Sequence, residues 1–188
     1  MKGEHGAGER RVAEVSSGTH RAYLMNNDRP ISLQFSIALV LSIACCTTSA
    51  WADFETGMDA YHRGDYSIAL REWRPLAEQW QMEEAQFNIG LLYENGRGVP
   101  QDYVQARHWY AKAAAQGYAR AQSNLGRLYE FGHGVTQNYV QAYMWYILGA
   151  AHGDNLGAEL RDALAKRMTS AQIFQAQQQA REWQPVKK

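Results

Sequence analysis

The chain has 188 residues, of which 46% are hydrophobic and 20% are charged. This composition is typical of a globular domain and argues against collagen, a largely disordered chain or a polytopic membrane protein. Lysine and arginine together number 19, as do aspartate and glutamate. Nucleic acid is therefore a disfavoured partner, because phosphate binding needs a concentrated positive surface.

An apolar run at residues 31–44 is followed shortly by Ala50 and Ala52. Small residues at these two positions suit a signal peptidase, so we predict a signal peptide at residues 31–52 that is cleaved between Ala52 and Asp53. The run is too short for a comfortable membrane span. We therefore expect the mature chain in the periplasm or outside the cell, with a retained signal anchor as the alternative.

Residues 1–30 form an N-terminal extension that is far longer than a signal peptide requires. The part before Met25 is rich in Gly, Glu and Arg and has little apolar content, which is typical of disorder. Met25 is an alternative start that would leave a short charged segment ahead of the apolar run. The extension is then either a disordered leader or a misannotated one.

Residues 53–84 are predicted to form a degenerate helix pair of the kind that follows it. The matching residues are Tyr61, Tyr66, Ala69 and Trp73, which align with Tyr93, Tyr103, Ala106 and Tyr110 of the next unit. The loop of this first pair is four residues shorter than in that unit. The closing glycine is also missing near Trp80, so the pattern does not show how the chain leaves this pair.

Residues 85–120 and 121–156 are two copies of one unit, with 20 of 36 positions identical. Random pairing would give about two identities at typical residue frequencies, so we infer an internal duplication. The first ten residues of each copy carry apolar residues at helical spacing. Gly90 and Gly126 lie inside these helices at a cost of roughly 1 kcal/mol, and we expect each to admit a neighbouring helix backbone.

A glycine-rich turn follows the first helix of each copy, at residues 96–102 and 132–138. Its glycines are suited to the positive φ of a helix exit, and Asp102 and Asn138 are predicted to cap the next helix. That second helix, residues 103–115 in the first copy, places small alanine beside large tyrosine on one face. This alternation lets two helices interdigitate.

The unit resembles the Sel-1-like repeat, a relative of the tetratricopeptide repeat. The 36-residue period, the Gly-x-Gly-Val turn, the Trp-Tyr pair and the Ala-Ala pair all coincide with that pattern. The resemblance implies an all-α fold, a right-handed α-solenoid of helix-turn-helix repeats closed by C-terminal capping helices. We expect a monomeric scaffold without enzymatic activity, whose partner is another protein or a peptide.

Residues 157–184 are predicted to form the capping helices, the second of them opened by a capping box from Thr169 to Gln172. A cap is needed because the last repeat would otherwise expose the apolar face that inner repeats bury on a neighbour. Residues 185–188 are expected to be a loose tail.

Catalytic and metal-binding patterns are absent from the sequence, which contains no His-Glu-x-x-His, Gly-x-Ser-x-Gly or phosphate-binding loop. The four histidines of the mature chain are spread along it with no pair at three- or four-residue spacing, so we expect no metal and no cofactor. Some proteins of similar repeats have been described as β-lactamases, but those carry a cysteine pair in each repeat. Here the cysteines, Cys45 and Cys46, precede the mature chain.

Glu94 and Glu130 are the carboxylates that could be imagined as a catalytic pair for glycoside hydrolysis. Both recur at the same place in the repeat, so we expect them on a solvated acidic face instead.

A binding groove is expected where the first helices of successive units line a concave face. Asn88 and Asn124 occupy the register in which similar tetratricopeptide repeats hold a peptide backbone or a terminal carboxylate. The alternative is that both side chains bond adjacent backbone within the protein.

Positions that differ between the copies are the places where ligand preference could reside. They are Phe87 against Ser123, Leu91 against Arg127, and Asn95 against Phe131. Apolar Phe87 and Leu91 beside cationic Arg127 would suit a peptide with an apolar side chain and a carboxylate, and ordinary surface drift is the alternative. The candidate groove residues are Phe87, Asn88, Leu91, Asn124, Arg127 and Phe131.

The predicted function is therefore that of an exported, bacterial-type scaffold that binds a protein or peptide in the cell envelope. One alternative is a cell-wall-active or β-lactamase-like hydrolase. The other is a structural accessory subunit of an envelope complex.

Overall fold

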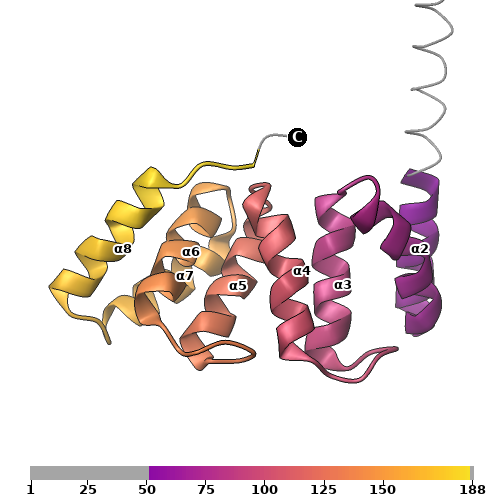
Figure 1. Cartoon of the computed structure of the whole chain (residues 1–188), viewed down its shortest axis with the longest axis horizontal. Coiled ribbons are helices and arrows are strands. Elements are labelled where there is room, and N and C mark those ends of the chain that lie inside the picture. Colours follow the sequence, from indigo (N-terminus) through magenta and orange to yellow (C-terminus); the bar gives the residue numbers. More distant parts are fainter. Residues whose placement is uncertain (1–50, 187–188) are drawn as a thin grey trace, which may run out of the picture. The chain divides into compact units, whose positions relative to one another are not determined.

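The computed structural model describes residues 51–186, and all regular structure in this range is helical (Figure 1). The all-α prediction is confirmed. Residues 51–63 are helical, and the described chain continues through seven further helices. These are α2 (Tyr66–Glu78), α3 (Glu83–Asn95), α4 (Tyr103–Ala115), α5 (Ala119–Phe131), α6 (Tyr139–Ala151), α7 (Asn155–Ala165) and α8 (Ser170–Glu182).

Several N-terminal predictions lie outside the described residues. They are the extension at residues 1–30, the alternative start at Met25 and residues 31–50 of the predicted signal peptide. The predicted cleavage site between Ala52 and Asp53 falls within the helical residues 51–63. No helix of the described range is both long enough and apolar enough to span a membrane.

The two central units share one local construction. The Asp102 carboxylate accepts hydrogen bonds from two backbone N–H groups in the first turn of α4, at 2.8 and 3.0 Å. The Asn138 side chain accepts one from the first turn of α6 at 3.1 Å. Helices α3 and α5 end at Gly96 and Gly132, whose φ values of 64° and 71° lie in the left-handed region. The predicted caps and glycine exits are confirmed.

The helices stack in chain order, each from α2 to α6 packing on its successor, with α6 also in contact with α8. Their apolar side chains form three clusters along this stack. The first joins residues 51–63, α2, α3 and Trp109 of α4. The second joins α3, α4 and α5, and the third joins α6, α7 and α8. The core is therefore a row of neighbouring contacts, as in a solenoid.

The glycines inside the first helices make room for an aromatic ring. A Cβ built on Gly90 would lie 2.6 Å from the Tyr110 ring, and one on Gly126 would lie 2.7 Å from the Tyr146 ring. Both tyrosines are fully buried. The prediction of close packing at these glycines is confirmed. The neighbour was expected to be a helix backbone, but the nearest atoms belong to a tyrosine ring of the second helix.

The degenerate first unit uses the same contact with a larger ring. A Cβ on Gly57 would lie 2.3 Å from the Trp73 indole, which identifies Gly57 as the equivalent helix glycine. Tyr61 follows Gly57 by four residues, just as Glu94 follows its own glycine by four. The predicted match of Tyr61 with Tyr93 is thus wrong by one residue, and Tyr61 holds the position of Glu94.

The chain leaves the first unit through a left-handed residue that is not glycine. Gln81 has a φ of 50°, whereas Gly117 and Gly153 close the later units with φ values of 94° and 97°. The turn is completed by a hydrogen bond from the Met82 N–H to the Leu76 carbonyl at 3.0 Å.

The C-terminal helices α7 and α8 cover the last repeat. Leu164 of α7 and Ala176 of α8 are buried in the cluster that includes α6, and the capping box at Thr169 is present. The tail after α8 runs back along the stack (Figure 1). Its Val186 N–H donates to the Ala115 carbonyl of α4 at 2.8 Å, so the expectation of a loose tail is wrong as far as Val186.

Candidate groove and the carboxylate contacts behind it

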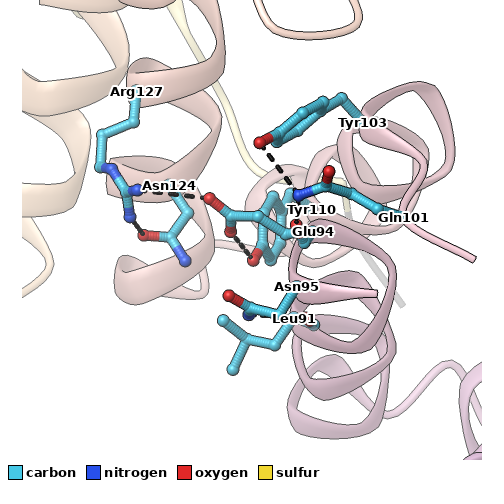
Figure 2. Close-up of polar contacts among 8 residues, drawn as sticks. All are labelled: Leu91, Glu94, Asn95, Gln101, Tyr103, Tyr110, Asn124 and Arg127. Atoms are coloured by element: carbon cyan, nitrogen blue, oxygen red, sulfur yellow. Dashed lines mark hydrogen bonds and ion pairs between the residues drawn. The ribbon is translucent and has the colours of Figure 1, made fainter. Parts of the chain in front are cut away.

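Glu94, in the last turn of α3, joins three helices through its carboxylate (Figure 2). Oε2 accepts a hydrogen bond from the Tyr110 hydroxyl of α4 at 2.5 Å, and Oε1 lies 3.3 Å from Nη2 of Arg127 on α5. The Glu94 side chain is only 12% exposed. A single carboxylate therefore connects one helix pair to the next.

The same arrangement recurs one unit further along. Glu130 of α5 is 6% exposed, and its Oε2 accepts from the Tyr146 hydroxyl of α6 at 2.7 Å. Its Oε1 accepts from Nη1 of Arg167 at 2.6 Å. Arg167 comes from the turn after α7, so here the capping segment supplies the arginine that the next repeat supplies to Glu94.

These contacts control the protonation of the two tyrosines. Burial raises the pKa of Tyr110 and Tyr146 well above the ordinary tyrosine value, and the neighbouring carboxylates raise it further. Both hydroxyls therefore remain neutral hydrogen-bond donors. The expected solvated acidic face is wrong for Glu94 and Glu130, because each carboxylate is enclosed by its own tyrosine and arginine.

The two candidate asparagines have different surroundings. Asn124 is only 8% exposed, and its Oδ1 accepts from Nη1 of Arg127 at 3.4 Å (Figure 2). It therefore belongs to the Glu94 contacts, and its partner is a side chain instead of the adjacent backbone that the alternative specified. Asn88 is half-buried, with Nδ2 3.5 Å from the Met58 sulfur.

Phe87 is a core residue, so its assignment to the candidate groove is wrong. It is 2% exposed, and its ring centroid lies 5.7 Å from that of Tyr110 and 5.3 Å from that of Tyr118. The guanidinium of Arg120 lies 4.8 Å from the ring centroid. Tyr118, just before α5, and Arg120, in its first turn, thus cover the Phe87 ring.

The other candidates are at least partly accessible. Leu91 is half-buried, the Arg127 side chain is 40% exposed, and Phe131 is 54% exposed. Leu91 and Arg127 hold equivalent positions on α3 and α5, as Asn88 does with Asn124. We call Asn88, Leu91, Arg127 and Phe131 the groove surface.

The Glu–Tyr–Arg contacts were missed in the sequence. Both glutamates and both tyrosines are identical between the copies, which was a usable signal. The arginines follow their glutamates by different separations, 33 residues for Arg127 and 37 for Arg167, so the 36-residue period did not reveal them.

Two of the histidines contact side chains of other segments. His133 stacks on Tyr103 with ring centroids 4.5 Å apart, and Nδ1 of His152 lies 2.8 Å from Oε1 of Gln122. Across residues 51–186 no group of three or more His, Cys, Asp or Glu side chains could hold a metal ion.

Helix pairs with shared caps, glycine turns and inter-pair contacts define an α-solenoid of helix-turn-helix repeats. The model of the Sel1 repeat matches residues 83–118 and 119–154, two residues ahead of the unit boundaries used above.

Two solved structures are similar to this chain. One is c5321, a protective antigen present in uropathogenic Escherichia coli strains and displaying an SLR fold, with 33% identity and a TM-score of 0.67 over 71% of this chain and 29% of that chain. The other is a Sel1 repeat protein from Oxalobacter formigenes, with 32% identity and a TM-score of 0.55 over 67% of this chain and 97% of that chain. The chain belongs to the Sel1 repeat family. It spans only 29% of the length of c5321, and no curated protein matches its sequence.

Proposed function

We propose that the chain is an exported scaffold that binds another protein or a peptide in the cell envelope through the groove surface. The observation that carries this proposal is the position of Arg127. Its guanidinium is held by Glu94 and Asn124 at 3.3 and 3.4 Å, yet its side chain is 40% exposed.

Arg127 is suited to bind a carboxylate. A guanidinium has five N–H donors in a rigid plane, and the contacts with Glu94 and Asn124 fix that plane between two units. Donors that remain accessible are thereby preorganised, which reduces the entropy lost on binding. Half-buried Leu91, at the equivalent position on α3, offers an apolar contact. The ligand class is a peptide that carries an apolar side chain near an acidic group.

The carboxylates argue for binding in preference to hydrolysis. Glu94 and Glu130 each accept hydrogen bonds from a buried tyrosine and an arginine, so both are occupied in joining units. Proteins of this repeat family typically act as protein-interaction scaffolds. The proposal accordingly assigns no catalytic residue and no cofactor.

The position of the first buried residue of the described core supports export. Phe54 is buried, and its carbonyl accepts a hydrogen bond from Nε1 of Trp73 at 3.2 Å. Cleavage between Ala52 and Asp53 would leave this contact intact. An intact mass that begins at Asp53 is the expected result for protein recovered from the envelope or medium, and a chain that still carries residues 31–44 would contradict export.

The groove is tested by comparing captured proteins. Wild type, Arg127→Gln and Leu91→Ser are immobilised and exposed to envelope extract, and bound proteins are quantified by mass spectrometry. Arg71→Gln is the matched control, because Arg71 is 73% exposed on α2. We expect a partner that the control retains and that both groove variants lose by about tenfold, which corresponds to 1.4 kcal/mol of binding free energy.

Folding must be separated from binding, since Arg127 also contacts Glu94. Each variant is therefore compared below the onset of its own thermal unfolding. Asn88→Ala provides a second groove variant outside the Glu94 contacts. Identical sets of captured proteins from all five chains would refute the groove. Release of soluble fragments from isolated cell wall by the wild type would support the hydrolase alternative.

A further inference from the structure

Three arginines contact the same position of successive helix pairs. That position follows the helix glycine of each pair by four residues, and its side chains are Tyr61, Glu94 and Glu130. Each is met by one guanidinium, from Arg97, Arg127 and Arg167 respectively, at 2.6, 3.3 and 2.6 Å. Equivalent positions of stacked repeats lie on one side of a solenoid. The three guanidiniums therefore form a row with one member at each joint between units, which we call the arginine row.

The guanidiniums of this row lie outside the groups that hold them. The side chains of Arg127 and Arg167 are 40% and 48% exposed, whereas those of Glu94 and Glu130 are 12% and 8% exposed (Figure 2). Each carboxylate also accepts a hydrogen bond from a buried tyrosine hydroxyl, which keeps it on the inner side of its ion pair. A ligand at this surface therefore meets guanidinium N–H donors before it meets carboxylate oxygens.

Arg97 is held by uncharged groups. Its Nη1 donates to the Tyr61 hydroxyl, and its guanidinium lies 5.7 and 5.4 Å from the ring centroids of Tyr61 and Tyr66. The turn that carries it is seated on the start of α2, since a Cβ on Gly98 would lie 2.8 Å from the backbone nitrogen of Ser67. Arg97 is exposed. These contacts fix the cation in place without neutralising it, so it is available to an anionic ligand.

The spacing of the row fits one peptide conformation. Helices in contact have axes about 8–10 Å apart, which sets the approximate distance between successive members. A polyproline II helix has three residues per turn and advances about 3.1 Å per residue, so every third side chain points to the same side at intervals of about 9 Å. Half-buried Leu91 occupies the position on α3 that Arg127 occupies on α5, and exposed Phe131 follows Arg127 by one turn. Both offer apolar surface to proline rings.

We propose that the arginine row binds a peptide in the polyproline II conformation that carries an acidic side chain at every third position. This inference rests on the proposed function, because Arg127 belongs to both surfaces, and it adds Arg97 and Arg167 as binding residues. Each guanidinium donates to one carboxylate of the ligand and keeps its contact within the protein. Because the prolines already hold the peptide in its bound conformation, little entropy is lost on binding.

Synthetic peptides of one composition and two spacings test the row. The probes are fluorescein-labelled Glu-Pro-Pro-Glu-Pro-Pro-Glu and its clustered isomer Glu-Glu-Glu-Pro-Pro-Pro-Pro, and binding to the purified full chain is measured by fluorescence anisotropy. The spaced peptide should bind at least about tenfold more tightly than the clustered one, and added salt should weaken it. Equal affinities would show attraction without register and overturn the proposal. So would equal binding of Gln-Pro-Pro-Gln-Pro-Pro-Gln.

Arginine variants test the assigned contacts. Arg97→Gln and Arg167→Gln should each weaken binding of the spaced peptide by about fivefold, the upper range for an exposed ion pair. The matched Arg71→Gln should leave it unchanged. Arg97→Gln is the more informative variant, because it breaks no ion pair of the fold, and the thermal unfolding of each variant checks that it is folded at the assay temperature. Wild-type affinity in both row variants would overturn the proposal.

Failure of the row can be distinguished from failure of the groove. Suppose that Arg127→Gln and Leu91→Ser lose a captured envelope protein, while Arg97→Gln and Arg167→Gln retain both that protein and the spaced peptide. The groove then stands and the row is wrong. If all four variants retain everything that the wild type binds, both are wrong. Tighter binding of inorganic polyphosphate than of the spaced peptide would assign the row to a phosphate polymer and overturn the peptide proposal.

Discussion

Replacement of Glu130 by alanine tests whether the buried carboxylates hold successive repeats together. Glu130 is 6% exposed and accepts hydrogen bonds from the Tyr146 hydroxyl at 2.7 Å and from Arg167 at 2.6 Å. The variant leaves a buried hydroxyl without its acceptor and removes the contact between α5 and the capping segment.

The magnitude follows from the exposure of the two partners. A buried hydroxyl that loses its acceptor costs about 1–3 kcal/mol. The Arg167 side chain is 48% exposed, so water replaces much of its interaction and the ion pair adds at most about 1 kcal/mol. We expect Glu130→Ala to lower the free energy of unfolding by about 3 kcal/mol, and the midpoint of thermal unfolding by about 10 °C for a chain of this size.

Urea unfolding followed by tryptophan fluorescence and circular dichroism measures this loss. Glu159→Ala is the control, because Glu159 is exposed on α7 and its removal should change stability by less than about 0.5 kcal/mol. The double variant with Tyr146→Phe should lose less than the sum of the single losses, by about 1 kcal/mol or more. A loss for Glu130→Ala no larger than the control would refute a stabilising role for these contacts.

Three other variants or conditions test the packing. Gly126→Ala should destabilise the protein by about 2 kcal/mol despite alanine's higher helix propensity, because the new Cβ would lie 2.7 Å from the Tyr146 ring; a more stable variant in thermal unfolding would contradict this. Gln81→Gly should stabilise by up to about 1 kcal/mol, since the φ of 50° favours glycine, while Gln81→Ala should give no gain in the same assay. The raised pKa values of Tyr110 and Tyr146 mean that the unfolded chain loses these protons first, so the free energy of unfolding should hold up to about pH 9 and fall above about pH 10. Urea unfolding across this pH range should show that the free energy of unfolding falls less steeply when both tyrosines are replaced by phenylalanine. The same dependence on pH in both chains would contradict a role for the buried hydroxyls.

Local features of the fold were predictable from the residues themselves. Asp102 and Asn138 cap the helices that follow them, and Gly96 and Gly132 end the helices before them. Each of these interactions joins residues only a few positions apart, so a short stretch of sequence is enough to predict it. Each pattern also occurs in both copies of the unit, which makes a chance occurrence less plausible.

The candidate site was less predictable because its contacts cross between units. Phe87 was assigned to a groove, but its ring is covered by Tyr118 and Arg120, which lie about 30 residues further along the chain at the start of α5. Arg127 was selected for differing between the copies, yet its contact with Glu94 joins residues 33 positions apart. No periodicity within one unit contains that information.

The sequence by itself determined that this protein is a stack of duplicated helix pairs, because helix periodicity, caps and glycine turns are local. Only the tertiary structure decided which of the shared side chains face a neighbouring unit. Glu94 and Glu130, expected in solvent, are enclosed between units, and the tail returns to the end of α4. The physical reason is that burial and pairing depend on how one unit is seated on the next, which is set by the sum of many contacts between residues far apart in the chain.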